Sequence, residues 1–289
     1  MAFGLALAGG GIRGAAHVGV LLALEEAGMK PDSIAGTSAG GIVAGLYAAG
    51  ITAEQLRDTV LKLAKSGAAL ADPDLPGILT LVPELLARQR GACSGLLKGN
   101  KMENYLSGLV GDKTMREIPM RLCIPAVDLI TGRTVVFTNS LANVKPFGGV
   151  KWNAGVKLCE AMRATSAIPA VFQPKMVQGM CLVDGGVTDV LPVDLLLAAG
   201  SPPVLAVDVS ECYKMPERIT LPEVVSHSLS IMETRLRQCV TRGEKLLLTP
   251  DLPETSGVLN LRQMPACMEA GYRSAKAALP LIQSIFPDE

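Results

Sequence analysis

Residues 33–50 read SIAGTSAGGIVAGLYAAG and combine a short strand pattern, a glycine-flanked serine and a helix-like run. Ser33 to Gly36 is predicted to form a strand, and Gly40 to Ala49 a helix that ends at Gly50. Ser38 therefore falls at the junction between them, inside the pattern G-x-S-x-G. A strand followed by a sharp turn and a helix is typical of one unit of an α/β fold.

The N-terminal residues have the same order. Phe3 to Ala8 is an apolar run that ends in three glycines, and Gly14 to Ala27 is predicted to be a helix that ends at Gly28. Two such units in succession need right-handed crossovers, so we expect a mainly parallel sheet with helices on both faces. Further strands are expected at 122–127, 134–138, 181–183 and 204–209, and further helices at about 101–110, 155–163, 192–199, 223–237 and 265–285.

Length and composition fit one domain. With 289 residues, 49% of them hydrophobic, the chain can bury a full core, and we expect a single domain over residues 1–289. Its motif-bearing part spans about residues 3–210, and residues 211–289 are expected to form a helical C-terminal extension of the same domain. Residues 67–100 interrupt the alternation of strands and helices, and they are interpreted equally well as a mobile cover over a site or as a surface excursion.

Charge and cysteine content exclude several classes of partner. Lys plus Arg and Asp plus Glu number 27 each, so no net positive field gathers nucleic acid, and no nucleic acid partner is expected. The seven cysteines never form a CxxC pair, so they are expected to be reduced thiols, most of them buried. Neither a metal nor a cofactor is expected.

Two further patterns concern location. The N-terminus lacks the basic segment of a secretory signal and turns glycine-rich by Gly9, so a cytoplasmic location is expected. Residues 33–53 carry no charge and also resemble a transmembrane helix rich in small residues. Their five glycines leave too little apolar side chain to favour lipid, so this interpretation is the weaker one.

The turn around Ser38 has the features of a nucleophile elbow. A serine on so sharp a turn adopts a strained backbone, and the residues two before and two after it must be small, as Gly36 and Gly40 are. The following helix directs its N-terminal N–H groups toward the serine, where a tetrahedral oxyanion would form. A glycine-rich turn that only packs a helix close to a sheet is the structural alternative.

A second glycine-rich loop, Gly9-Gly10-Gly11-Ile12-Arg13-Gly14, occupies the first strand-to-helix turn. In a parallel sheet, neighbouring turns of this kind open on the same edge, so the loop would lie beside Ser38 and donate backbone N–H groups to an oxyanion. Its first, third and sixth residues also satisfy the dinucleotide fingerprint G-x-G-x-x-G, which leaves a dinucleotide-binding oxidoreductase as an alternative. That fold needs an acidic residue at the end of the second strand, whereas Asp32 precedes the strand.

Three residues are candidates for the base that would activate Ser38. The chain has only two histidines, and His17, three residues into the first predicted helix, is interpreted as structural. His227 would complete the Ser-Asp-His order of an α/β-hydrolase triad. Asp184 follows a short strand and precedes two glycines, so its carboxylate would stand at the sheet edge, where burial raises its pKa and makes it a better proton acceptor. An ordinary turn aspartate has the same pattern.

Together these segments resemble the patatin-like phospholipase family, acyl hydrolases that use a serine–aspartate dyad without histidine. The resemblance rests on G-G-G-x-R-G at residues 9–14, G-x-S-x-G at 36–40 and D-G-G at 184–186, in the family's order. Two weaker segments agree, the ATSAIPAVF run at 164–172 and the D-x-x-T-G turn at 128–132. The resemblance covers roughly residues 3–210 and implies a three-layer αβα sandwich around a mainly parallel sheet.

The resemblance also implies roles and an activity. Ser38 would be the nucleophile, Asp184 the base, and the backbone of Gly9, Gly10 and Gly11, with Arg13 nearby, the oxyanion hole, while His17 would take no catalytic part. The expected activity is hydrolysis of fatty-acyl esters, of the phospholipase, lysophospholipase or carboxylesterase type. An apolar groove lined from residues 78–86 would hold the acyl chain, unless these residues only pack a helix onto the core. Contact with a membrane would be peripheral and brief, and a non-catalytic lipid-binding protein on the same scaffold stays a further alternative.

Overall fold

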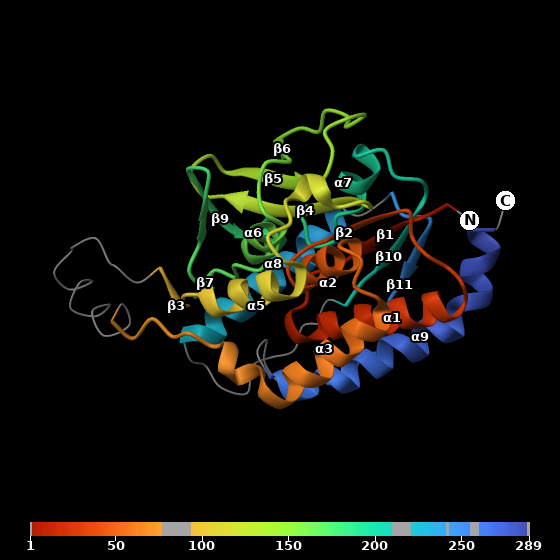
Figure 1. The fold of residues 1–289 in the computed structure, drawn as a ribbon, viewed down its shortest axis with the longest axis horizontal. Coiled ribbons are helices and arrows are strands. Elements are labelled where there is room, and N and C mark those ends of the chain that lie inside the picture. Colours follow the sequence, from red (N-terminus) through yellow and green to blue (C-terminus); the bar gives the residue numbers. More distant parts are fainter. Residues whose placement is uncertain (1, 77–93, 210–220, 241–242, 255–259, 288–289) are drawn as a thin grey trace.

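The computed structural model describes residues 2–76, 94–209, 221–240, 243–254 and 260–287. Within this part of the chain the principal sheet has nine strands (Figure 1). Its main path runs, in order, through β11 (Leu246–Leu248), β10 (Val204–Val207), β1 (Gly4–Leu7), β2 (Ser33–Gly36), β4 (Arg121–Asp128), β5 (Arg133–Thr138) and β6 (Val150–Asn153). Two more strands, β8 (Lys175–Val177) and β9 (Met180–Asp184), join it through β4, while β3 (Gly95–Leu97) and β7 (Ala170–Phe172) pair separately.

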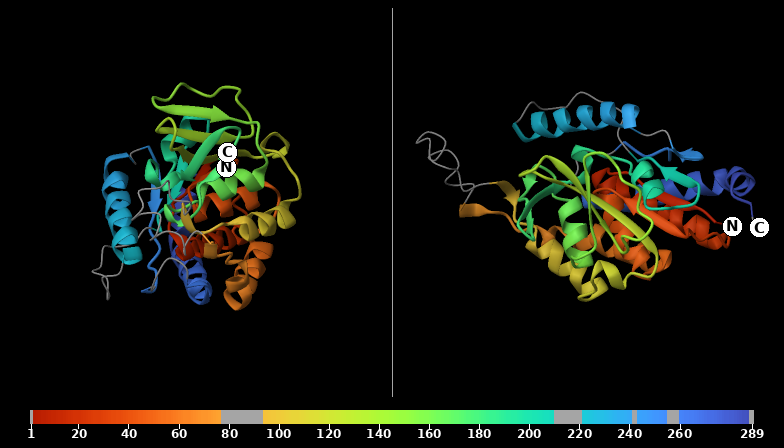
Figure 2. Two further views of the ribbon diagram at one scale, coloured as in Figure 1. Left: turned by 90° about the vertical axis from the view of Figure 1, so that its left-hand side faces the viewer. Right: turned by 90° about the horizontal axis from the view of Figure 1, so that it is seen from above.

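Helices cover both faces of this sheet. They are α1 (Ala15–Glu26), α2 (Ala39–Ala48), α3 (Ala53–Ser66), α5 (Asn100–Val110), α6 (Leu158–Thr165), α7 (Val193–Ala198), α8 (Leu221–Val240) and α9 (Met264–Ile285). The β1-α1-β2-α2-β4 path and the β10-α8-β11 path move along the sheet in opposite directions. Parallel crossovers are right-handed as a rule, so opposite directions along the sheet place the helices on opposite faces, and α8 does lie on the face opposite α1 and α2 (Figure 2). The predicted three-layer fold with a mainly parallel sheet is confirmed.

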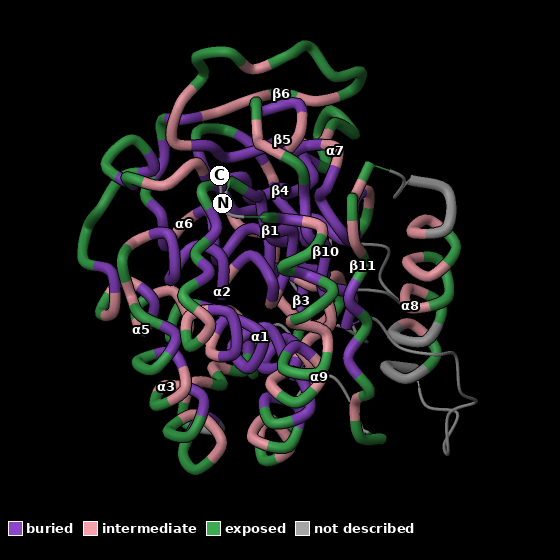
Figure 3. Tube along the Cα trace, turned by 90° about the vertical axis from the view of Figure 1, so that its right-hand side faces the viewer, coloured by how far each residue is buried: buried purple, intermediate pink, exposed green. Residues whose placement is uncertain are grey.

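The centre of the sheet is parallel and fully buried. β1 pairs in parallel with β10 on one side and β2 on the other, and every residue of these three strands is buried. Strands covered on both faces need continuous apolar sequences, which is why these segments read as apolar runs. Figure 3 shows the buried strands at the centre, with exposed residues along the outer sides of the helices.

The C-terminal helix packs against the first one. A Cβ atom on Gly19 of α1 would lie 1.9 Å from the backbone oxygen of Met268, and one on Gly271 of α9 would lie 2.1 Å from that of Ala16. Glycines at the two positions therefore let the helix backbones come into direct contact. In addition, β11 extends the sheet beside β10, so residues beyond 210 contribute both a strand and a helix to the same core. A single domain over 1–289 stays a prediction.

Most of the predicted elements are confirmed, whereas the short strands β3, β6, β7, β8 and β11 and the helix α3 were not predicted. The helix predicted at 155–163 begins only at Leu158, because Lys157 has an extended backbone and is the N-cap, with its N–H donating to the Glu160 side chain. Helix α3 was not predicted, although its capping box of Thr52 and Gln55 is a local start signal. Residues 33–53 form β2 and the ten-residue helix α2 rather than a membrane-spanning helix, and no helix among the described residues is long and apolar enough to span a bilayer.

Because α1 and α9 are in close contact, a methyl group added at their interface should lower the free energy of unfolding. Gly271→Ala places a Cβ against the backbone of Ala16, so the helices must separate, and we expect the free energy of unfolding to fall by about 2 kcal/mol. Gly108→Ala is the matched control, because Gly108 lies within α5 with open space around it. There the gain in helix propensity should stabilise the protein slightly. Urea denaturation of both variants measures the difference, and equal effects would contradict this packing.

Candidate active site

Two strands meet the same edge of β4 from opposite directions. β2 runs parallel to β4 and pairs with Arg121–Cys123, whereas β9 runs antiparallel to it and pairs with Ala126–Asp128. Both lie on the edge that β5 leaves open, so the carboxyl ends of β2 and β9 point at each other. Because Ser38 follows β2 and Asp184 ends β9, the sheet itself brings these two side chains together.

Pro125 lies in the gap between the two strand ends. A Cβ on Gly185 would lie 2.4 Å from the backbone oxygen of Pro125, so this carbonyl faces the gap. The N–H and C=O groups of a strand residue point to the same side, so the N–H that proline lacks would have faced the gap as well. A proline is therefore tolerated here in a central strand, and the chain leaving β9 needs glycine at position 185.

The turn that carries Ser38 is strained and tightly packed. Ser38 has φ 53° and ψ −123°, a region that residues other than glycine rarely adopt. A Cβ on Gly36 would lie 2.2 Å from the backbone oxygen of Gly40, and one on Gly40 would lie 2.5 Å from that of Leu7. The Ser38 N–H donates a 3.0 Å hydrogen bond to Oγ1 of Thr165, at the end of α6. Glycine at 36 and 40 and the Thr165 hydroxyl together hold the strained turn.

Ser38 and Asp184 form a buried hydrogen-bonded pair. Oγ of Ser38 donates to Oδ2 of Asp184 at 2.7 Å, and Oδ1 of Asp184 accepts the N–H of Gly186 at 2.8 Å. Burial raises the pKa of Asp184 to about 7, while the hydrogen bonds from Ser38 and Gly186 partly oppose that rise. A carboxylate in direct contact with a hydroxyl, with a pKa near neutrality, is able to accept the hydroxyl proton.

The first glycine loop lies against Ser38, as the sequence predicts. A Cβ on Gly9 would lie 3.4 Å from Cβ of Ser38, and the N–H of Gly9 is used in a 2.9 Å hydrogen bond to the Val190 backbone oxygen. Among the hydrogen bonds of the described residues, none uses the N–H of Gly10 or of Gly11. The amide of Gly9 is therefore already engaged, whereas those of Gly10 and Gly11 have no protein acceptor among the described residues.

The other predicted site residues differ in how they lie. Arg13 belongs to the 3₁₀ turn η1 (Gly11–Gly14), and its charge partly opposes the rise that burial causes in the pKa of the Cys267 thiol on α9. His17 is fully buried, with Nε2 2.8 Å from the backbone oxygen of Ala8, and its structural role agrees with the sequence interpretation. His227 belongs to α8, but its side chain and the predicted groove residues 78–86 lie outside the described part of the structure.

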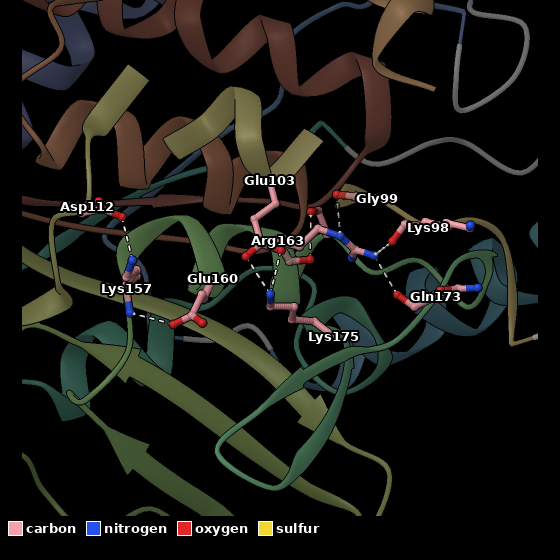
Figure 4. A network of polar contacts seen from close by, with 10 residues as sticks. Lys98, Gly99, Glu103, Asp112, Lys157, Glu160, Arg163, Gln173 and Lys175 are labelled. Atoms are coloured by element: carbon pink, nitrogen blue, oxygen red, sulfur yellow. Dashed lines mark hydrogen bonds and ion pairs between the residues drawn. The ribbon is translucent and has the colours of Figure 1, made fainter. Parts of the chain in front are cut away.

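Arg163 ties α6, which carries Thr165, to the neighbouring small sheet (Figure 4). Arg163 is 2% exposed, and its guanidinium donates to the backbone oxygens of Lys98, Gly99 and Gln173 at 2.9, 3.2 and 2.7 Å. The same group stacks 5.2 Å from the ring centre of Phe172. Three carbonyl acceptors compensate a buried cation, so β3 and β7 are attached firmly to the helix beside the site.

Two residues of the site have no local sequence signal. Thr165 lies within the ATSAIPAVF run, but the pattern does not indicate that its hydroxyl accepts the Ser38 amide. Glu233 reaches the site from α8, a helix that follows Asp184 by 37 residues or more, and a Cβ on Gly186 would lie 3.1 Å from its Oε1. Within the described residues no cluster of three or more His, Cys, Asp or Glu side chains could hold a metal ion.

A mainly parallel sheet between two helical layers, with a serine on a strained strand-to-helix turn beside a buried aspartate, is an α/β fold with a candidate serine–aspartate site. The sequence comparisons identify the family. A family model described as Patatin-like phospholipase matches residues 5–197, and the chain belongs to this family. An uncharacterised NTE family protein of Mycobacterium tuberculosis is 26% identical over 96% of this chain and 46% of its own length. The mouse patatin-like phospholipase domain-containing protein 6 is 29% identical over 71% of this chain and 13% of its own length.

Solved structures agree on the fold. VipD from Legionella pneumophila superposes with a TM-score of 0.51 at 13% identity, over 96% of this chain and 67% of that one. Human GIVD cytosolic phospholipase A2, in complex with methyl γ-linolenyl fluorophosphonate, gives a TM-score of 0.50 at 13% identity, over 98% and 59% of the two chains. The chain spans about half the length of the mycobacterial relatives it matches.

The hydrogen bond from the Ser38 amide predicts the effect of removing one hydroxyl group. Thr165→Val keeps the shape of the side chain but leaves the buried amide without its acceptor, and we expect a loss of about 2 kcal/mol in the free energy of unfolding. The control is Thr59→Val on α3, whose hydroxyl donates to the Gln55 backbone on an exposed face and should matter little. Chemical denaturation measures the free energy of unfolding of both variants. A Thr165→Val variant as stable as the wild type would contradict the role assigned to this hydrogen bond.

His17 predicts a pH dependence of stability. Burial lowers the pKa of His17 to about 4 from an ordinary value of 6.5. Between these two pH values His17 is protonated in the unfolded chain but neutral in the folded protein, so stability falls as the pH falls. Between pH 7 and pH 5 this should remove about 2 kcal/mol of stability. In His17→Gln, which can keep the donor to Ala8, that contribution should vanish. Unfolding curves of both proteins at the two pH values test this, and an equal change in both would contradict it.

Proposed function

We propose that this protein is a serine-dependent lipid acyl hydrolase in which Ser38 is the nucleophile and Asp184 the base. The single observation that carries the proposal is the 2.7 Å hydrogen bond from Ser38 Oγ to Asp184 Oδ2 on a strained strand-to-helix turn. A hydroxyl held against a desolvated carboxylate is poised for deprotonation, because burial raises the proton affinity of the acceptor. Membership of the patatin-like phospholipase family supports ester hydrolysis as the reaction.

The proposed reaction proceeds through an acyl-enzyme. Oγ of Ser38 bonds to the carbonyl carbon of the ester while its proton passes to Asp184, and the N–H groups of Gly10 and Gly11 bind the oxyanion. When the tetrahedral intermediate collapses, the bond to the leaving alcohol breaks and that oxygen takes the proton from Asp184. Water then attacks the acyl group by the same steps in reverse order, with Asp184 again as the base, and releases the fatty acid.

The substrate class follows from the relatives rather than from a described groove. The human phospholipase A2 structure contains a fluorophosphonate with a γ-linolenyl chain, so a related fold can hold a long hydrocarbon chain. By analogy we assign phospholipid, lysophospholipid or other fatty-acyl esters to this protein. Peripheral, brief contact with a membrane and a cytoplasmic location belong to the same proposal.

A Ser-Asp-His triad with His227 is the second candidate mechanism, since α8 carries this residue on the face of the sheet where Glu233 approaches Asp184. The direct contact of Ser38 and Asp184 favours the dyad, because a triad places the histidine between the serine and the acid. A non-catalytic lipid-binding protein is disfavoured by the maintained strain at Ser38, which has no value for binding alone.

Labelling with a fluorophosphonate tests the proposal without a known substrate. We expect the wild type to be labelled on Ser38, Ser38→Ala to be unlabelled, and Asp184→Asn to react at least about 100-fold more slowly because the base is lost. His227→Ala should be labelled at the wild-type rate. Intact-protein mass spectrometry and peptide mapping give the rates and the site.

Two results would contradict this assignment. A folded wild type that takes up no label would support the lipid-binding alternative. A folded His227→Ala that loses its labelling, while Asp184→Asn keeps a residual rate, would support the triad.

A further inference from the structure

A second carboxyl group lies beside Asp184. Oε1 of Glu233 and Oδ1 of Asp184 are 3.1 and 3.2 Å from one point in space, the position that a Cβ on Gly186 would take. The two oxygens therefore face the same small volume at the start of the turn η4 (Gly185–Val187). Since Asp184 already accepts the Gly186 N–H through Oδ1, the carboxyl of Glu233 adds negative charge on the side of Asp184 away from Ser38.

Glu233 does not fit the pattern of a structural carboxylate. It is partly buried between α8 and η4, and among the described residues it forms no hydrogen bond or ion pair. Burying a carboxylate without a partner costs free energy, so such a group is seldom retained for stability. Burial, and then the charge of Asp184, raise the pKa of Glu233 to about 7, the same value as that of Asp184.

The helix that carries Glu233 is attached at few points. No described residue of α8 is fully buried, and Val224, Ile231 and Met232 are 43%, 39% and 65% exposed. An ion pair between Arg237, one turn after Glu233, and the buried Asp208 after β10 connects the helix to the sheet. Among the described side chains of α8, the attachment of Glu233's helix to a fully buried residue is thus this charged contact, one turn away.

We propose that Glu233 is a positioning residue of the active site, whose carboxylate beside Asp184 sets the proton affinity of that base and so the pH range in which Ser38 reacts. This inference rests on the proposed function, because it acts through Asp184. The charged groups around Glu233 are Asp184 at the end of β9, Arg235 and Arg237 on its own helix, and Asp208 after β10, which pairs with Arg237. Asp208 is paired with Arg237, whereas Asp184 has no cationic partner among the described contacts and lies against the same glycine, Gly186, as Glu233.

The direction of the effect follows from like-charge repulsion. Two neighbouring carboxylates resist being ionised together, so an ionised Glu233 makes Asp184 bind its proton more tightly. Asp184 then becomes a stronger base above neutrality but loses its charge earlier as the pH falls. Without Glu233, Asp184 should stay ionised to a lower pH, and the reaction of Ser38 should persist to a lower pH with it.

The experiment is the rate of fluorophosphonate labelling of Ser38 between pH 5 and pH 9. In this reaction Oγ of Ser38 bonds to phosphorus, fluoride leaves, and Asp184 takes the hydroxyl proton. Glu233→Gln keeps the size of the side chain and removes its charge, and we expect the midpoint of the acidic limb to move down by about one pH unit. Glu233→Ala should move it in the same direction, which gives a second measurement if the glutamine variant does not fold.

Met232→Gln is the matched control, because Met232 precedes Glu233 on α8 but its side chain is mostly exposed. The pH profile of Ser38 labelling in this variant should fall at the same acidic pH as that of the wild type. A folded Glu233→Gln whose profile also coincides with the wild type, or falls equally at every pH, would overturn the role of Glu233 and leave it a structural residue. Absence of any label on wild-type Ser38 would instead overturn the proposed function itself, so the two failures are distinguishable.

Discussion

The candidate active site depends on the pairing of two strands, β2 and β9, with the same edge of β4. β2 occupies it from one end and β9 from the other, so the chain leaving β2 and the chain ending β9 arrive at the same place. Ser38 and Asp184, 146 positions apart in the sequence, are thereby brought into hydrogen-bond contact by backbone pairing rather than by flexible loops. Groups held by strands are positioned more accurately than groups on loops, and the proposed proton transfer between the two side chains requires such accuracy.

This arrangement also removes the site from water. Where two strand ends meet, space remains only for glycines at 36, 40 and 185, and the serine and aspartate are 6% and 4% exposed. Low exposure strengthens the electrostatic effect of each neighbouring group, including the amides of the glycine loop and the carboxyl of Glu233. Strain at Ser38, a raised proton affinity at Asp184 and an adjacent unpaired carboxyl thus follow from the same close packing.

Whether a site residue can be predicted from the sequence depends on how far along the chain its contacts lie. Ser38, Asp184 and the glycine loop could be predicted because each lies in a short segment where strand, turn and small residues occur together. Thr165 and Glu233 could not, since their roles arise from contacts with residues far away in the chain. The edge strand β6 was missed because it is only half-buried and has no apolar run, whereas the predicted parallel strands were found through their continuous burial.

The most direct measurement of the central claim is a crystal structure of the protein after reaction with a fluorophosphonate. We expect phosphorus bonded to Oγ of Ser38, its oxygen within hydrogen-bond distance of the N–H groups of Gly10 and Gly11, and the Asp184 carboxylate still adjacent to Oγ. An adduct on another side chain, or a histidine interposed between Ser38 and Asp184, would contradict it.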